Sequence, residues 1–314
     1  EIYTLSLHDA LPIFGRTLAE TGESVSKVSL AGLFCGEFAP CQCPYGIDGL
    51  AHMAVRGGWP EERLQTAADA QIVVRDYLES VFVQSVPLLG GNELTARRLS
   101  LSLARNLGQS VKVDTLARDV YVRRSDEKVL EAQRKGISAH LDILRRIFLV
   151  DEVPGWVPAS RFPKRMRVKP KRYFTDPSLP VALLGLSPAA LLQDWQTFGL
   201  VFENLVMRDL DVYARALDFV VASPIRYYHD DSGLEVDAII ERVDGSWAAI
   251  EVKVGLDKVD EGVANLMRMR DKVCANKRAR TPEPVFMAVI TGTGEAAYRR
   301  SDGIYVIPIR ALGA

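Results

Sequence analysis

Two carboxylates and a lysine on neighbouring predicted strands form the strongest chemical pattern in this sequence. Asp237 stands in the segment LEVDAII, and Glu251 and Lys253 follow in AIEVK. Because side chains alternate along a strand, Glu251 and Lys253 share one face. Carboxylate oxygens are the ligands that Mg²⁺ and Mn²⁺ prefer, and a nearby lysine can orient a water or balance charge. The pattern predicts a catalytic site at these three residues, with Asp237 and Glu251 as ligands of Mg²⁺ or Mn²⁺.

The segment that carries these residues is predicted to form a β-hairpin. A two-residue turn would set the polar face of one strand against the apolar face of the other. A three-residue loop that ends at Gly245, with this glycine in the left-handed conformation, avoids the conflict and pairs Arg242 with Ser246. In that register Asp237 lies opposite Glu251.

The predicted register brings two negative charges together. Directly opposed residues have Cβ atoms roughly 4.5–5.5 Å apart, and two carboxylates at that range repel unless a cation or a shared proton lies between them. A second interpretation needs no metal: an ordinary hairpin with a solvated charged face, in which Lys253 neutralises Glu251. In either case the alternation places the apolar side chains of the first strand on the opposite face, and these are Leu234, Val236, Ala238 and Ile240.

The elements around the hairpin follow a recognisable order. A long helix over residues 194–216 carries Glu203 on an apolar face, where a buried carboxylate needs a partner. We expect Glu203 to assist at the catalytic site, although a free position at the helix edge explains it equally. Together with the D…E-x-K pattern, the order αβββαβ resembles the PD-(D/E)xK nuclease fold. The other predicted elements are strand 225–228, the hairpin, helix 259–273, strand 285–290 and a final strand 304–309.

The preceding region, residues 95–177, is predicted to be a winged-helix unit. Three helical stretches over 96–106, 114–120 and 128–147, the last interrupted or kinked at Gly136, precede two wing strands over 148–153 and 171–174. Basic side chains in and beside the second strand could bind DNA phosphates; a solvated loop or a surface that docks an upstream domain are the alternatives. These residues are Lys164, Arg165, Arg167, Lys169, Lys171 and Arg172.

Composition excludes several classes of protein. The chain has 39 Lys and Arg against 40 Asp and Glu, so its net charge gives no global signal for nucleic acid or membrane. No apolar run approaches the roughly 20 residues of a membrane span. Four cysteines without a secretory signal indicate a reducing, cytoplasmic location. No G-x-x-x-x-G-K-[ST] motif is present, so the sequence contains no recognisable ATP site.

From Phe14 onward, the sequence is similar to the C-terminal two-thirds of prokaryotic AAA-type ATP-binding proteins that end in a domain of unknown function 4143. The matching segments are Gly22-Glu23-Ser24, VSLAGLF, VRGGWP, RDYLES, LARN, LRRIFLVDEVPGW, KPKRYFTDPSL, GLVFENLVMRDL, GLEVDAII, AIEVK and VITGTG. The resemblance implies an upstream ATPase module that would bind ATP. The first 13 residues instead resemble a translated sequencing adapter, so we expect a chain truncated at its N-terminus.

The expected organisation is α/β, or α+β overall. It comprises an adapter-derived segment (1–13), a remnant of the ATPase module and its helical lid (14–94), a winged-helix-like segment (95–187) and a restriction-endonuclease-like domain (188–314). Two functions fit this organisation. One is metal-dependent cleavage of DNA at Asp237, Glu251 and Lys253. The other is a catalytically silent nuclease fold that binds DNA or protein and regulates the ATPase.

Overall fold

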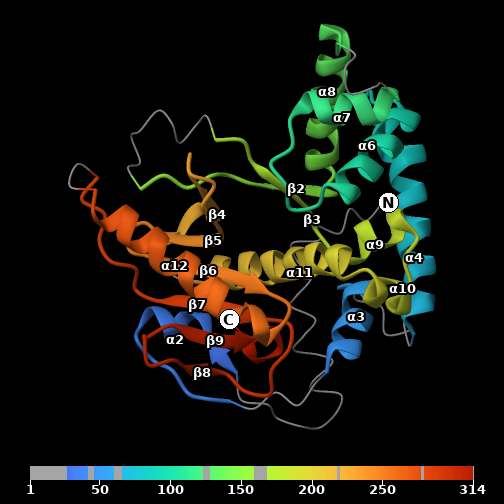
Figure 1. Ribbon diagram of the computed structural model, residues 1–314. Coiled ribbons are helices and arrows are strands. Elements are labelled where there is room, and N and C mark those ends of the chain that lie inside the picture. Colours follow the sequence, from blue (N-terminus) through green and yellow to red (C-terminus); the bar gives the residue numbers. More distant parts are fainter. Residues whose placement is uncertain are drawn as a thin grey trace. The chain divides into compact units, whose positions relative to one another are not determined.

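Figure 1 shows the computed structural model of the chain, which is α+β as expected. It describes residues 27–41, 46–59, 66–122, 128–158, 168–217, 220–276 and 279–313. In this described part, no helix is long and apolar enough to cross a membrane.

The chain forms two compact units, each assembled from separate stretches of sequence. Among the described residues, the first unit holds those between 51 and 152 and between 169 and 205. The second holds the remainder, namely 27–50, 153–158, 168 and those from 206 onward. The boundaries predicted after residues 94 and 187 both fall inside the first unit.

The first unit is mainly helical, and its wing follows the predicted order. Three helices, α6, α7 and α8, precede β2, which pairs with β3. The interruption predicted at Gly136 is wrong, because α8 runs unbroken from Glu131 to Arg146. A Cβ at Gly136 would lie 3.1 Å from the Tyr121 hydroxyl, so close packing accounts for the glycine. The elements that lie wholly or partly in this unit are α3 (Ile47–Arg56), α4 (Ala67–Ser80), a π-helical turn (Val81–Ser85), α5 (Val86–Leu88), α6 (Glu93–Arg105), α7 (Val113–Tyr121), α8 (Glu131–Arg146), β2 (Val150–Val153), β3 (Lys171–Phe174), α9 (Ser178–Leu184), α10 (Pro188–Gln193) and α11 (Trp195–Arg215).

Two buried polar side chains hold the loops of this unit. Asp176 accepts hydrogen bonds from the backbone N–H of Gly58 (2.7 Å) and of Ser178 (2.8 Å), and so ties the end of α3 to the start of α9. Asn204, fully buried on α11, bonds both the N–H (2.8 Å) and the carbonyl (2.9 Å) of Phe174. Asn204 therefore completes the hydrogen bonding of a buried strand and attaches β3 to α11.

The second unit is built on a six-stranded mixed sheet in the order β4-β5-β6-β7-β9-β8. The pairs β4-β5, β5-β6 and β8-β9 are antiparallel, while β6-β7 and β7-β9 are parallel. Helix α12 packs on β5, β6 and β7 (Figure 1). The elements are β4 (Val220–His229), β5 (Glu235–Arg242), β6 (Trp247–Lys253), η4 (Leu256–Lys258), α12 (Val259–Cys274), β7 (Met287–Thr291), β8 (Tyr298–Arg299), β9 (Tyr305–Pro308) and η5 (Ile309–Ala311). With α11 before them, they confirm the predicted order αβββαβ.

The early segment VSLAGLF belongs to this second unit. Its strand β1 (Val28–Ser29) pairs in parallel with β10 (Leu312–Gly313) near the end of the chain. Helix α2 (Leu30–Phe34) follows, and the ring of Phe34 packs edge-on against Phe286, with the centroids 5.1 Å apart. A prediction that reads the chain in order could not anticipate this pairing, because β1 and β10 are almost the whole sequence apart.

Candidate active site

The hairpin forms in the predicted register. Gly245 has φ +85° and closes the three-residue loop, and the N–H of Arg242 donates to the carbonyl of Ser246 at 2.9 Å. The ladder then runs from Glu241 opposite Trp247 to Ala238 opposite Ile250. The next residues along the two strands are Asp237 and Glu251. Turn chemistry alone therefore brings the two carboxylates to adjacent positions.

The pairing of β5 with β4 shifts by one residue at Asp237. Arg226 lies opposite Ile239, whereas Tyr228 lies opposite Val236, so a β-bulge falls between these pairs. As a result, Val236 and Ile239 both contribute to one hydrophobic cluster. The strict alternation predicted for this strand is wrong at the bulge, because an extra residue reverses the faces beyond it.

At the bulge, the carboxylate of Asp237 takes over a hydrogen bond of the ladder. Its Oδ2 accepts from the backbone N–H of Val252 at 2.8 Å. Hydrogen-bonded pairs recur at every second residue of an antiparallel ladder, so in an undisturbed hairpin this N–H would donate to the carbonyl of Val236. Asp237 is therefore held by the backbone of β6, beside Glu251.

Glu251 is buried and ion-paired with Lys253. Its side chain is 2% exposed, and Oε2 lies 3.2 Å from Nζ of Lys253. The other oxygen, Oε1, is buried and accepts no hydrogen bond within the described part of the chain. The ammonium of Lys253 also lies 3.8 Å from Oε1 of Glu261, on the first turn of α12. Lys253 thus stands between a buried carboxylate and an exposed one.

Helix α12 approaches the carboxylates closely because Gly262 lacks a side chain. A Cβ at this position would lie 3.4 Å from Cβ of Glu251 and 3.5 Å from Cε of Lys253. These two distances are ordinary van der Waals contact, and the same Cβ would lie 3.3 Å from Cγ2 of Val289, which is tight, so a residue larger than alanine would displace the helix or the two charged side chains. Gly262 and Glu261 are the site residues that the sequence prediction missed. A glycine on the apolar face of a predicted helix was the available signal.

The electrostatics of the site favour a proton on Glu251. Burial and the negative charge of Asp237 raise the pKa of Glu251 far above its usual range, and Lys253 offsets this only in part. Burial alone would lower the pKa of Lys253, but Glu251 and Asp237 outweigh it and raise that pKa. The shared proton predicted for two adjacent carboxylates is therefore favoured in the metal-free protein.

The donor set fits a hard divalent cation. Two carboxylates stand together, and one of them has a buried oxygen with no hydrogen-bond donor in the described part of the chain. A cation would offset both the burial and the repulsion by Asp237 that raise the pKa of Glu251. Within the described residues, no group of three or more His, Cys, Asp and Glu side chains is arranged to hold a metal. Asp237 and Glu251 would thus hold the ion together with water or substrate oxygens.

Residues 198–312 match the family model of a domain of unknown function, DUF4143. The match confirms the C-terminal domain that the sequence resemblance suggested. Residues 47–190 match a second family model, a domain of unknown function, DUF8612. No curated protein and no solved structure matches the chain.

Glu203, the fourth predicted catalytic residue, lies in the DUF4143 region but in the first structural unit. Its Oε1 accepts hydrogen bonds from Nζ of Lys171 (3.2 Å) and from the hydroxyl of Tyr173 (2.5 Å). The carboxylate on the apolar helix face is therefore paired, as burial requires. These bonds join α11 to β3. A role of Glu203 in catalysis stays a prediction.

The six basic residues predicted to contact DNA do not form one surface group. Lys171 and Arg172 are only 3% and 8% exposed. Lys171 pairs with Glu203, and Nε of Arg172 lies 2.9 Å from Glu152, so a role in phosphate binding does not fit these two side chains. Lys169 is exposed. The others, Lys164, Arg165 and Arg167, lie outside the described residues.

Proposed function

We propose that the DUF4143 region is a nuclease-like domain that hydrolyses phosphodiester bonds of DNA with the help of Mg²⁺ or Mn²⁺. The observation that carries this proposal is the group of Asp237, Glu251 and Lys253 at the end of the hairpin. Two adjacent carboxylates stand within reach of one ammonium, and one of them is buried with an oxygen that has no donor among the residues the structure describes.

Each side chain has a distinct part in the proposed reaction. Asp237 and Glu251 would hold the cation, which would polarise a phosphate and acidify a water when bound. The ammonium of Lys253 would then be released from Glu251 and could orient the attacking water or balance charge on the phosphate. Glu261 would keep this ammonium near the site, since its carboxylate already lies 3.8 Å away.

A cleavage assay with isosteric variants tests the proposal. The full chain would be incubated with labelled single-stranded and duplex DNA, in EDTA or with added Mn²⁺ or Mg²⁺. We expect cleavage only with metal. We also expect Asp237→Asn and Lys253→Met to reduce the rate by at least about 100-fold, the usual contribution of such a group. Glu295→Gln, at an exposed carboxylate, is the matched control and should cleave like the wild type. Equal rates for all four proteins would contradict the proposal.

A second candidate function is a catalytically silent nuclease fold that binds DNA or a partner protein and regulates an upstream ATPase. The burial of Glu251 favours it, because a side chain that is 2% exposed leaves little room for a phosphate. This function predicts DNA or partner binding without metal-dependent turnover, and it predicts that Asp237→Asn leaves binding unchanged. The ATPase, with its ATP, remains an expectation from the family resemblance.

A further inference from the structure

A buried threonine ends strand β7 beside the candidate active site. All five residues of β7 are buried, and Thr291, the last of them, is 0% exposed. Its Oγ1 has no hydrogen-bond partner in the described part of the chain. A buried hydroxyl without a partner is unfavourable, whereas valine has nearly the same shape and suits a buried strand. The hydroxyl at this position therefore weakens the fold and calls for an explanation.

Thr291 lies directly beside Lys253 in the sheet. Strands β6 and β7 are parallel, and their register pairs Lys253 with Thr291. The N–H of Gly292 donates to the carbonyl of Lys253 at 3.1 Å, which fixes this register at the end of the two strands. Neighbouring strands are roughly 4.8 Å apart. The long, flexible stem of a lysine can span that distance.

Thr291 and Lys253 also share one face of the sheet. A Cβ at Gly262, on α12, would lie 3.3 Å from Cγ2 of Val289 and 3.4 Å from Cβ of Glu251, so these two side chains face the helix. Because side chains alternate along a strand, the residues two positions further on face the same way, and these are Thr291 and Lys253. The hydroxyl is therefore on the side of the sheet where the ammonium of Lys253 lies.

The loop after β7 closes over this hydroxyl. Gly294 has φ +125°, and a Cβ on it would lie 3.7 Å from Oγ1 of Thr291 and 3.3 Å from Cγ of Pro308. A residue with a side chain would be strained at this φ and tight against the proline. Since Thr291 is closed off from solvent, a partner for its hydroxyl has to come from the protein itself.

The ammonium of Lys253 needs a new acceptor when the site is loaded. Its nearest acidic oxygens are Oε2 of Glu251 at 3.2 Å and Oε1 of Glu261 at 3.8 Å. When Asp237 and Glu251 hold a cation, the first of these oxygens is no longer free for the ammonium. The second contact is too long for a hydrogen bond. An ammonium has three donors, so Glu261 alone does not replace what is lost.

We propose that Thr291 is a positioning residue of the nuclease site, whose hydroxyl accepts a hydrogen bond from the ammonium of Lys253 once Glu251 holds the cation. The ammonium is then fixed between Thr291 and Glu261, where it can orient the attacking water. The inference rests on the proposed function and adds to it the group that holds the lysine in the loaded site. It also explains the buried hydroxyl, which is unfavourable until the ammonium moves to it.

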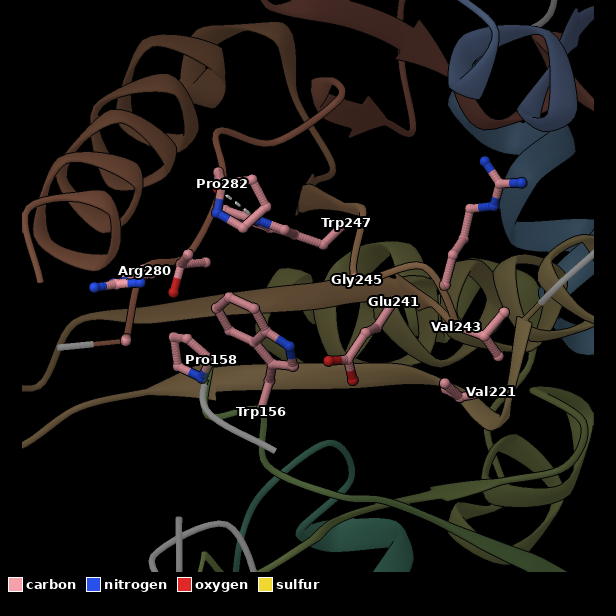
Figure 2. Close-up of a pocket in the computed structure, with 12 residues that line it drawn as sticks. Trp156, Pro158, Val221, Glu241, Val243, Gly245, Trp247, Arg280 and Pro282 are labelled. Atoms are coloured by element: carbon pink, nitrogen blue, oxygen red, sulfur yellow. Dashed lines mark hydrogen bonds between the residues drawn. The ribbon is translucent and has the colours of Figure 1, made fainter. Parts of the chain in front are cut away.

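Thr281 provides a matched control for the loss of a buried hydroxyl. Its Oγ1 is also buried and has no partner among the described residues. Thr281 lines a pocket at the loop end of the β5–β6 hairpin, where Gly245 and Trp247 line it as well (Figure 2). Strand β6 extends from Trp247 beside this pocket to Lys253, roughly 20 Å further along. Thr281 is therefore remote from the carboxylates.

Calorimetric titration of the full chain with Mn²⁺ tests the proposal. The variants are Thr291→Val, Thr291→Ser and Thr281→Val, and urea denaturation in EDTA checks their folding. Both valine variants should fold and raise the urea midpoint, because each removes a buried hydroxyl without a partner. Only Thr291→Val should weaken Mn²⁺ binding, by roughly tenfold, as expected for a lost hydrogen bond to a charged group. Thr291→Ser keeps the hydroxyl and should bind Mn²⁺ within about threefold of the wild type.

A double variant separates a positioning role from a structural one. In Lys253→Met no ammonium is left to hold, so adding Thr291→Val should change the Mn²⁺ affinity by less than about twofold. A tenfold loss that persists without the lysine would overturn the inference, and so would wild-type affinity in Thr291→Val.

The cleavage assay distinguishes failure of this inference from failure of the proposed function. With saturating Mn²⁺, Thr291→Val should lower kcat by at least about tenfold with KM unchanged, and Thr291→Ser should restore kcat. Wild-type cleavage by Thr291→Val would reject the inference and retain the nuclease. Mn²⁺ binding that depends on Thr291, without cleavage by the wild type, would retain the inference and reject the nuclease. A wild type that does not bind Mn²⁺ would overturn both.

Discussion

Replacing Glu251 by glutamine tests whether this side chain holds a proton in the metal-free fold. Burial and the adjacent Asp237 raise the pKa of Glu251 from its ordinary value of 4.5 to about 9. The folded chain therefore keeps a proton over the pH range in which the unfolded chain releases it. The resulting stabilisation is fully present below pH 4.5 and is lost as the pH rises toward 9. Glutamine has no proton to lose, so Glu251→Gln should abolish this dependence.

The size of the effect follows from a single proton. One proton bound in the folded state and released in the unfolded state changes the free energy of unfolding by at most about 1.4 kcal/mol per pH unit. Between pH 6 and pH 8, the wild type should lose roughly 3 kcal/mol of stability relative to Glu251→Gln. Solvent screening hardly reduces this figure, since Glu251 is 2% exposed.

Urea denaturation at pH 6, 7 and 8, in EDTA, measures this difference. Tryptophan fluorescence is a suitable signal, because Trp247 lies on the same strand as Glu251 and packs against Trp156. Glu295→Gln should follow the wild type. If the free energy of unfolding changes with pH in the same way for the wild type and for Glu251→Gln, the proton on Glu251 is refuted. Mn²⁺ added at pH 8 should restore stability to the wild type and to Glu295→Gln but not to Glu251→Gln, since the cation would replace the proton.

Two further substitutions test how the site and the wing are held. Gly262→Ala places a Cβ 3.3 Å from Cγ2 of Val289, a tight contact, and beside Glu251 and Lys253, so we expect a loss of about 1 kcal/mol in urea denaturation and weaker Mn²⁺ binding by calorimetry. Gly199→Ala, in a helix with open space around it, is the control and should stabilise by up to about 1 kcal/mol; equal effects of both would argue against close packing. Asn204→Ala leaves a buried N–H and carbonyl of β3 without partners. It should destabilise the chain by at least about 2 kcal/mol in the same assay, and a loss below 0.5 kcal/mol would exclude the anchoring role.

Local turn chemistry made the register of the hairpin predictable from sequence. Gly245 permits the left-handed residue that a three-residue loop requires, and this loop alone sets Asp237 beside Glu251. The bulge at Asp237 was not predictable, because it depends on how β4 pairs with β5 and not on the alternation within β5. The closeness of α12 depends on tertiary packing in the same way, which is why Gly262 was missed.

Charge patterns were a weaker guide than turn patterns. Lys171 and Arg172 are consecutive basic residues in a predicted wing, and contact with DNA phosphates was the prediction for both, with solvation as an alternative. The structure instead places them in buried ion pairs with Glu203 and Glu152. Both partners lie on other elements, Glu203 on α11 and Glu152 on β2. The sequence near the two basic residues therefore contains no sign of the pairing.

The placement of Asp237 and Glu251 at the end of the hairpin is energetically unfavourable, and this argues for a catalytic role over a scaffold role. Glu251 is buried with one oxygen that no donor in the described part of the chain reaches, and Asp237 replaces a backbone carbonyl as the acceptor for Val252. Both features weaken a metal-free sheet, since a buried polar atom without a partner is unfavourable and a bulge disrupts the ladder. A hairpin that served only as a scaffold would be more stable with glutamine or leucine at position 251. Two departures from regular sheet structure therefore meet at the point where a cation would offset both, and perturbed carboxylates of this kind are characteristic of functional sites.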